Sequence, residues 1–90
     1  MKFEYDKHKS QINKEKHGID FLEAQKLWQD ENALVVPANI VDEEIRYALI
    51  SNILTKCFTA IFTIRDNSYR IISVRRCRKN EERGYENNNS

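Results

Sequence analysis

KCFTAIFTIRDNSYRIISVRR, at residues 56–76, has the pattern of a two-stranded β-hairpin. Residues 56–65 and 69–76 are rich in β-branched and aromatic side chains, which favour strands. Between them lies Asp66-Asn67-Ser68, a run of residue types that favour a turn. The sequence therefore predicts an antiparallel hairpin, around which the other elements are arranged.

Alternation along the hairpin divides its side chains between two faces. One face is apolar and consists of Phe58, Ala60, Phe62 and Ile64, with Ile72 and Val74 from the second strand. The other face consists of Cys57, Thr59, Ile61, Thr63 and Arg65, with Ile71, Ser73 and Arg75. We expect the apolar face to pack against helices. That leaves a shared polar face made of Thr59, Thr63, Arg65, Ser73 and Arg75, which Arg46 of a preceding strand can join.

Two helices are predicted before the strands. Asp6 can cap a helix over residues 7–17, and Gly18 is well placed to end it. Asp20 and Glu23 have the spacing of a capping box, which starts a second helix. The apolar face of that helix consists of Phe21, Ala24, Leu27 and Trp28.

Shorter segments complete the predicted fold. Residues 3–5 alternate like a short edge strand, and residues 34–36, ended by Pro37, form another strand. Residues 44–50 are a further strand, and residues 80–86 are a last helix. This order predicts an α+β fold with two N-terminal helices packed on a small antiparallel sheet of about four strands, and a short C-terminal helix.

Length and composition indicate one small globular protein. The 90 residues predict a single domain over 1–86 and a disordered polar tail over 87–90. With 40% hydrophobic and 32% charged residues, the chain has the composition of a soluble protein. No apolar run approaches the roughly 20 residues of a membrane span, and the first residues lack the apolar core of a secretory signal. We therefore expect a cytoplasmic protein that does not bind membranes.

The two cysteines, Cys57 and Cys77, give no sign of a metal site. They form no C-x-x-C pair and have no His or Cys companions at zinc spacing. We expect two reduced, partly buried thiols. No cluster of carboxylates or imidazoles has ligand spacing either, so neither a metal nor another cofactor is expected.

Charge is distributed unevenly, although the formal net charge is only +1. Lysines dominate residues 2–17 and arginines dominate residues 65–86, whereas acidic residues dominate residues 20–46. Two basic ends therefore flank an acidic middle, a pattern compatible with a site for a polyanion. Solvated charged faces on a small domain explain the same pattern.

Arginines such as Arg65 and Arg75 above a sheet suit a phosphate group, because guanidinium is always charged and binds phosphate oxygens in a bidentate fork. Arginine is a poor proton donor near neutral pH, so a proton carrier has to come from elsewhere. The candidates are His17, Tyr85, Lys16 or a carboxylate, and His17 is favoured because imidazole changes charge near neutral pH. A structural hydrogen bond for His17 and a merely solvated sheet face are the alternatives.

Four segments, taken in order, resemble the BrnT family. The opening is similar to W-D-x-x-K-x-x-x-N-x-x-K-H-G followed by F-x-x-A, with Tyr5 in place of Trp, and matches at Asp6, Lys9, Asn13, Lys16-His17-Gly18, Phe21 and Ala24. Glu43-Glu44 and Arg46-Tyr47 resemble the E-E-x-R segment, with Ile45 inserted. Thr63, Arg65 and the run from Arg70 to Arg75 resemble T-x-R…R-I-I-S-A-R. Glu82-Arg83 and Tyr85-Glu86 match an E-R-x-x-Y-E ending, one residue tighter here.

The resemblance covers nearly the whole chain and implies a fold and an activity. It implies a RelE-like α+β fold and a toxin of a type II toxin–antitoxin system that inhibits translation by cleaving RNA. It also implies a neighbouring antitoxin of the BrnA kind, which binds the toxin, dimerises and represses the shared operon through its own DNA-binding domain. His17, Arg65, Arg70 and Arg75 match motif positions of the family.

Together these observations predict a metal-independent endoribonuclease in a toxin–antitoxin heterotetramer, with contact to DNA only through the antitoxin. The expected catalytic residues are Arg65, Arg75 and His17, and the expected RNA-binding residues are Arg70, Arg46, Arg76, Lys16 and Tyr85. The main alternative is a non-catalytic interaction module whose basic sheet face binds a protein partner. A DNA-binding regulator is a weaker alternative, since the second helix buries its apolar residues and offers few side chains to read bases.

Overall fold

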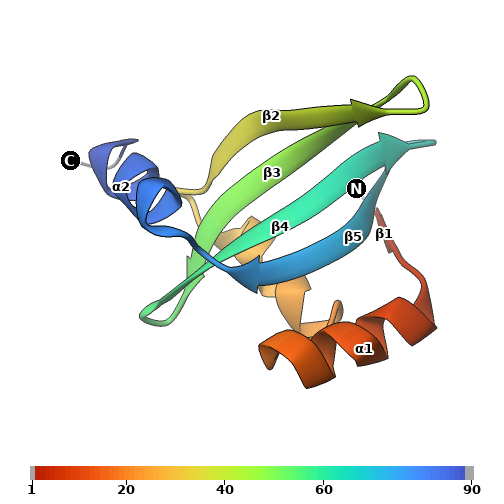
Figure 1. Ribbon diagram of the computed structural model, residues 1–90, viewed down its shortest axis with the longest axis horizontal. Coiled ribbons are helices and arrows are strands. Elements are labelled where there is room, and N and C mark those ends of the chain that lie inside the picture. Colours follow the sequence, from red (N-terminus) through yellow and green to blue (C-terminus); the bar gives the residue numbers. More distant parts are fainter. Residues whose placement is uncertain (1, 89–90) are drawn as a thin grey trace.

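Within residues 2–88, which the computed structural model describes, five strands form one mixed sheet in the order β1-β5-β4-β3-β2 (Figure 1). The strands are β1 (Lys2–Glu4), β2 (Leu34–Val41), β3 (Glu44–Ile53), β4 (Lys56–Arg65) and β5 (Ser68–Arg76). The helices are α1 (Lys7–His17), the 3₁₀ helix η1 (Glu23–Gln29) and α2 (Lys79–Asn88). The predicted antiparallel hairpin over residues 56–76 is confirmed as β4 and β5.

The predicted sheet of about four antiparallel strands is wrong, because β1 joins it as a fifth and parallel strand. β1 pairs with β5 from Lys2 opposite Ser68 to Glu4 opposite Arg70. The chain runs through α1 and η1 before it enters the sheet again, so the two strands can run in the same direction. Local alternation in residues 3–5 indicates a strand but carries no information about its partner.

Helix α1 confirms the first predicted helix and its caps. The Asp6 carboxylate accepts hydrogen bonds from the backbone N–H groups of His8 and Lys9, and Gly18 ends the helix with φ of 74°. The buried Asn13 side chain then pairs with the edge of β5, accepting from Val74 N and donating to Val74 O. α1 therefore continues the edge of β5 beyond the short β1.

The second predicted helix is wrong as an α-helix, although its capping box is present. Asp20 and Glu23 exchange the two expected hydrogen bonds, of 2.7 and 3.0 Å. The segment then winds as the 3₁₀ helix η1. Phe21, two residues before η1, and Ala24 and Leu27 within it are buried and recur every three positions, which matches the three residues per turn of a 3₁₀ helix. The molecule thus has one N-terminal α-helix rather than two.

Strand β2 continues past Pro37, where the sequence predicts an end. A register shift between Pro37 and Asn39 accommodates the proline, and β2 is an outer strand of the sheet. Proline is tolerated at a bulge or on an edge strand, because no ladder hydrogen bond needs its missing N–H.

A second bulge overturns the predicted alternation in β5. Ile61 pairs with Ser73 and Phe62 pairs with Ile71, which leaves Ile72 as an extra residue. Ile71, expected on the polar face, is therefore buried in the core beside Val74. The bulge also moves Arg70 opposite Thr63, onto the face expected to be polar.

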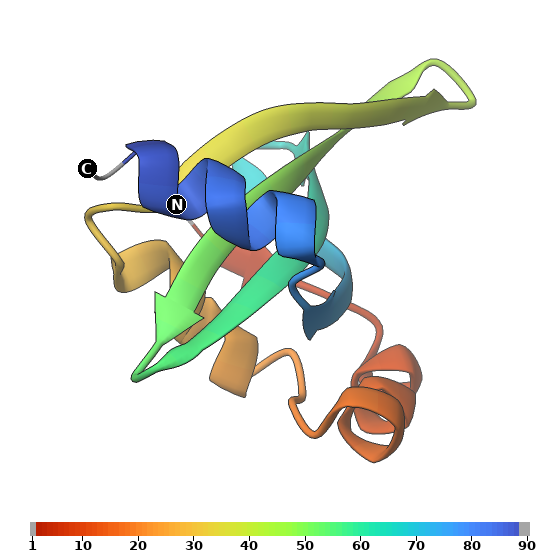
Figure 2. The same cartoon turned by 60° about the vertical axis from the view of Figure 1, so that its left-hand side comes forward.

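The sheet has one face against η1, called the inner face, and one face against α2, called the outer face (Figure 2). The inner face consists of residues such as Leu49, Ala60, Phe62 and Val74, which form the core with η1. Trp28 adds edge-to-face contacts with Phe3 and Phe62. The outer face carries Thr59, Ile61 and Thr63 of β4, and α2 packs mainly over its β2–β3 part.

Cys57 and Cys77 form a disulfide, so the expectation of two reduced thiols is wrong. The bridge joins the beginning of β4 to the residue after β5, where the strands are already paired. The spacing of 20 residues gave no indication of this proximity, which comes from the hairpin.

The last described element is α2. Helix α2 begins one residue before the predicted 80–86 helix and includes Asn87 and Asn88 of the expected tail, whereas residues 89–90 lie outside the described part of the chain. Among residues 2–88, no helix has the length and apolar content needed to cross a membrane.

Candidate functional site

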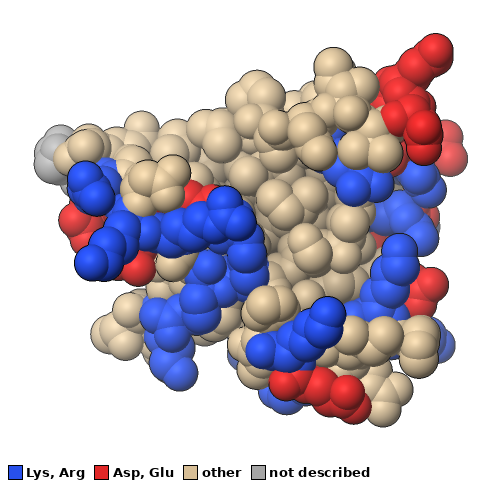
Figure 3. All heavy atoms as spheres, viewed as in Figure 1, with Lys and Arg blue, Asp and Glu red and all other residues tan. Residues whose placement is uncertain are grey.

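Positive charge gathers at two ends of the outer face, separated by an uncharged strip (Figure 3). One group of Lys and Arg side chains lies over α2, and another lies at the far end of the sheet and on α1. The two groups differ in what their arginines bind.

The group at the far end of the sheet lines a cleft of about 160 Å³, called here the arginine cleft. Its lining residues are Asp6, Lys9, Glu44, Arg46, Arg65, Arg70, Ile71 and Ile72. Four cations thus face two carboxylates, an excess of two positive charges. Asp6 is also engaged as the cap of α1.

Three neighbouring strands supply the arginines of this cleft. Arg46 comes from β3, Arg65 from the end of β4, and Arg70 from β5. Arg70 reaches the outer face only because of the bulge at Ile72, which pairs it with Thr63 two positions from Arg65. The β-bulge therefore assembles the cleft, as bulges often re-aim side chains at functional sites.

The arginines of the cleft do not use all their hydrogen-bond donors within the fold. Arg65 donates two hydrogen bonds to the Glu44 carboxylate, of 2.7 and 3.2 Å. Arg70 lies 3.7 Å from the Glu4 carboxylate, a distant ion pair. The Nε of Arg46 is buried and has no hydrogen-bond partner. A buried charged donor without a partner is costly, so this atom favours an incoming acceptor.

Glu44 is the carboxylate that competes with an incoming anion for Arg65. Its hydrogen bond with Arg65 lowers the pKa of the carboxyl, and the charges of Arg46 and Arg70 act in the same direction. The same contact raises the pKa of Arg65. Both groups are therefore charged across the whole neutral range.

His17 and Lys16 lie in a second, shallower depression of about 200 Å³ beside the arginine cleft. The two depressions share Lys9 and Ile72 and are therefore neighbours along α1 and β5; together they are called the groove. Of the sequence-predicted residues, Arg46, Arg65 and Arg70 lie together in the cleft, and Lys16 and His17 lie in the neighbouring depression.

Arg75 and Arg76 lie elsewhere. Arg75 pairs with Thr59, six positions from Arg65 along β4, which corresponds to about 20 Å. Its guanidinium binds the Glu81 carboxylate of α2 through two hydrogen bonds, of 2.7 and 2.9 Å. Arg76 donates to the backbone oxygen of Cys57 and lies 5.5 Å from the centre of the Phe58 ring, at the edge of the inner face.

Contact with Arg75 lowers the pKa of Glu81 to about 2, and a hydrogen bond from the Arg78 N–H acts in the same direction. Only 14% of the Glu81 side chain and 27% of the Arg75 side chain are exposed. This ion pair therefore holds the beginning of α2 against the sheet.

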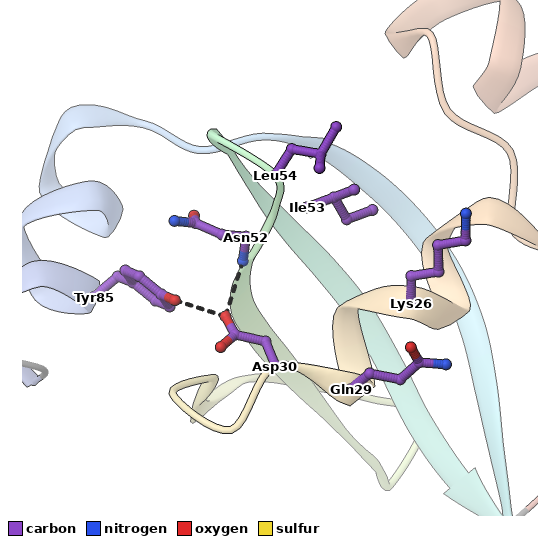
Figure 4. Close-up of a pocket in the computed structure, with 7 residues that line it drawn as sticks. All are labelled: Lys26, Gln29, Asp30, Asn52, Ile53, Leu54 and Tyr85. Atoms are coloured by element: carbon purple, nitrogen blue, oxygen red, sulfur yellow. Dashed lines mark hydrogen bonds between the residues drawn. The ribbon is translucent and has the colours of Figure 1, made fainter.

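Tyr85 is also engaged within the fold (Figure 4). Its hydroxyl donates to the Asp30 carboxylate at 2.6 Å, and this contact raises the pKa of Tyr85 to about 12. Burial tends to raise the pKa of Asp30, but hydrogen bonds from Tyr85, Asn32, Asn52 and Ser51 more than offset it, and the pKa is lowered. Tyr85 thus fastens α2 to the end of η1.

Sequence reasoning missed Lys9 and Glu44 as parts of the site. Lys9, Asn13 and Lys16 are spaced i, i+4, i+7, which places them on one face of α1, and this spacing could have indicated the face that meets β5. Glu44 gave no such signal, because its contact with Arg65 spans two strands. Within residues 2–88, no three His, Cys, Asp or Glu side chains form a group that could hold a metal ion.

Comparison with known proteins assigns the chain to a family. No curated protein gives a significant match. A family model described as the ribonuclease toxin BrnT of type II toxin–antitoxin systems matches residues 5–81, which include α1, all the strands after β1 and every residue that lines the groove. The chain therefore belongs to the BrnT family of type II toxin–antitoxin ribonuclease toxins.

Proposed function

We propose that this chain is an endoribonuclease that inhibits translation by cutting RNA, with the scissile phosphate bound in the arginine cleft. The observation that carries the proposal is the buried, unpartnered Nε of Arg46 beside Arg65 and Arg70. A phosphate oxygen is an acceptor that such a donor lacks, and guanidinium groups suit phosphate geometry.

The chemistry is attack of the adjacent 2′-hydroxyl on phosphorus, with the 5′-oxygen as leaving group. Negative charge builds up on the phosphorane that forms, and cations fixed in advance lower the barrier by several kcal/mol. Arg46, Arg65 and Arg70 supply those cations. Glu44 shares Arg65 with the phosphate, so RNA binding weakens the Glu44–Arg65 contact. We propose that no metal ion takes part, which EDTA treatment of the enzyme tests.

His17 is proposed as the proton carrier, because it lies in the same groove as the cleft and imidazole transfers protons near neutral pH. Lys16 lies beside it and contacts the RNA backbone. His17 lies eight residues, about 12 Å along α1, from Lys9, which borders both depressions, so this role requires the scissile linkage to lie between the cleft and His17.

Arg75, Arg76 and Tyr85 are proposed to act on flanking RNA rather than on the scissile phosphate. The distance of about 20 Å along β4 separates Arg75 from Arg65 by more than one phosphate. Arg75 engages RNA when its guanidinium exchanges Glu81 for a phosphate, and the Tyr85 ring offers a surface for a base.

A partner completes the proposal. Membership of a type II family implies an antitoxin. We propose that it is of the BrnA kind, that it forms a heterotetramer with this chain, and that DNA is contacted only through the antitoxin.

The test is cleavage of a long RNA by the purified chain, with the RNA ends mapped. The expected result is cleavage that leaves 2′,3′-cyclic or 3′-phosphate ends, persists in EDTA, and is lost in an Arg65→Ala/Arg75→Ala double variant. A matched control is Lys79→Ala/Arg83→Ala, which removes two cations of α2 that line neither depression. Absence of cleavage by the folded chain, with or without ribosomes, contradicts the proposal and favours a non-catalytic interaction module.

A further inference from the structure

The edge of the sheet formed by β2 is open over much of its length. Among residues 2–88, β2 pairs only with β3, on one side. Helix α2 meets the beginning of β2, where Gly84 lies near Leu34. Beyond that point the β2–β3 hairpin projects from the body of the molecule (Figure 2). Its remaining edge can accept hydrogen bonds from another strand.

The sequence of this edge carries no charge, and its protection against pairing is confined to Pro37 and its bulge. Natural edge strands commonly carry charged residues, and β2 reads LVVPANIV, with none. Pro37 and its bulge interrupt the edge only at one point. The uncharged segment after the bulge, residues 39–41, is therefore the part of the edge that is suited to a partner strand.

Exposed isoleucines extend this edge into an apolar surface. Ile40 pairs directly with Ile45, and they are 70% and 49% exposed. Ile45 and Ile64 line the same depression of about 300 Å³, and Ile64 is also 49% exposed. Val35, 51% exposed, adds to the surface further along β2. These four residues, called the isoleucine patch, lie on the inner face beyond the reach of η1, which packs on β3 and β4.

The turn at the tip of the β2–β3 hairpin is acidic and lies next to the isoleucine patch. Asp42 and Glu43 form the turn between β2 and β3 with positive φ, and both are exposed. Acidic side chains gather at this tip (Figure 3). The complementary partner is an apolar strand flanked by lysine or arginine.

We propose that the β2 edge and the isoleucine patch are the docking site of the antitoxin, which adds an apolar, basic-flanked strand to β2. The proposal rests on the proposed function only in identifying the partner as the antitoxin. Glu44 borders both the patch depression and the arginine cleft. The patch lies on the inner face and the cleft on the outer face, so an antitoxin docked on the patch obstructs the entry of RNA by extending around the hairpin past Glu44.

The test uses the full chain and, as probe, the antitoxin polypeptide encoded by the gene adjacent to that of this chain. Ile40→Lys/Ile45→Lys changes the patch, and Leu22→Lys/Leu54→Lys changes two exposed leucines outside it as a matched control. The patch variant should bind on the order of 30-fold more weakly or worse, as expected for a buried interface anchor. The control should bind like the wild type. Urea unfolding checks that both variants are folded.

Two further measurements sharpen the test. Hydrogen exchange should show the amides of residues 39–41 slowed by the bound antitoxin. Asp42→Asn/Glu43→Gln should lower the association rate several-fold at low salt and have less effect at high salt. RNA cleavage by the free patch variant should equal that of the wild type and resist neutralisation by the antitoxin.

Three outcomes overturn the docking site. One is an unchanged antitoxin affinity of the patch variant. Another is a free chain that dimerises through the patch, with antitoxin binding unaffected, since the occupant is then a second copy of the chain. A third is unchanged exchange across β2. If the wild type cleaves no RNA, the proposed function fails, while the binding measurements still decide the docking site.

Discussion

The two ends of the outer face contain arginines with different surroundings. At the α2 end, Arg75 is bound on both arms by Glu81, and the pair is largely shielded from water. At the far end, Arg65 is also bound twice, by Glu44, but this pair is more exposed and lies in an open cleft with Arg46 and Arg70, and one buried guanidinium nitrogen of Arg46 has no partner.

The two ends therefore differ in role: the arginine at the α2 end stabilises the fold, and the arginines at the far end are available to a ligand. A guanidinium whose donors are satisfied internally must break those bonds before it can bind phosphate. A cleft with an excess of two positive charges and an unsatisfied donor gains contacts when phosphate enters. We therefore place the scissile phosphate at the far end, and the following variants test this assignment.

Replacing His17, at the end of the groove, should have the largest effect on the rate of RNA cleavage. His17→Ala should slow RNA cleavage by about 100-fold or more, because loss of a positioned proton carrier costs about 10²–10⁴ in rate. The measurement is the single-turnover cleavage rate. His8→Ala is the matched control, since His8 lies on the same helix but lines neither depression. Equal rates for the two variants would show that His17 is structural.

Removing the unsatisfied arginine tests the cleft itself. Arg46→Ala should reduce the cleavage rate by about 100-fold, in the range found for loss of one preorganised donor to a developing negative charge. Its stability in urea should change little or increase, because a buried unpartnered donor disappears. A large loss of stability with full activity would instead give Arg46 a structural role.

Breaking the ion pair at the α2 end should affect stability rather than cleavage. Glu81→Gln should lower the free energy of unfolding at pH 7 by at most about 3 kcal/mol, because the pKa of Glu81 falls from its ordinary 4.5 to about 2. A depressed carboxyl pKa stabilises the fold above the unfolded-state value. The difference between variant and wild type should therefore be complete above about pH 5 and shrink as the pH falls towards 2. Urea unfolding at several pH values measures it, and a difference that does not depend on pH contradicts the assignment.

The smallest effect is expected at the other fastening of α2. Tyr85→Phe removes the hydrogen bond to Asp30 and should lower the free energy of unfolding by about 1 kcal/mol. RNA affinity should be unchanged, because the ring that is proposed to meet a base remains. A fall in affinity without loss of stability would show that the hydroxyl itself binds RNA.

The sequence predicted elements whose determinants are local. The hairpin over 56–76, the Asp6 and Gly18 caps of α1 and the Asp20–Glu23 capping box are all confirmed. Each depends on residues within a few positions of one another, or on an alternation that a tight turn folds back on itself.

What could not be predicted depends on distant pairing. The bulge at Ile72 places Ile71 and Arg70 on the opposite faces from those predicted. The run from Arg70 to Val74 fits a regular strand equally well, so the sequence does not reveal the bulge. The bond of Arg75 to Glu81 arises only when α2 turns back over the sheet, so Arg65 and Arg75 look equivalent in the sequence. The parallel pairing of β1 and the disulfide likewise follow from the assembled sheet.

The most direct test of the account compares Arg65→Ala and Arg75→Ala as separate variants on the same RNA. The measured quantity is the single-turnover cleavage rate at saturating enzyme, with folding verified by urea unfolding. We expect Arg65→Ala to slow cleavage at least tenfold more than Arg75→Ala, and Arg75→Ala mainly to lower the free energy of unfolding. Equal losses of rate, or a greater loss in Arg75→Ala, would contradict the assignment of the scissile phosphate to the arginine cleft.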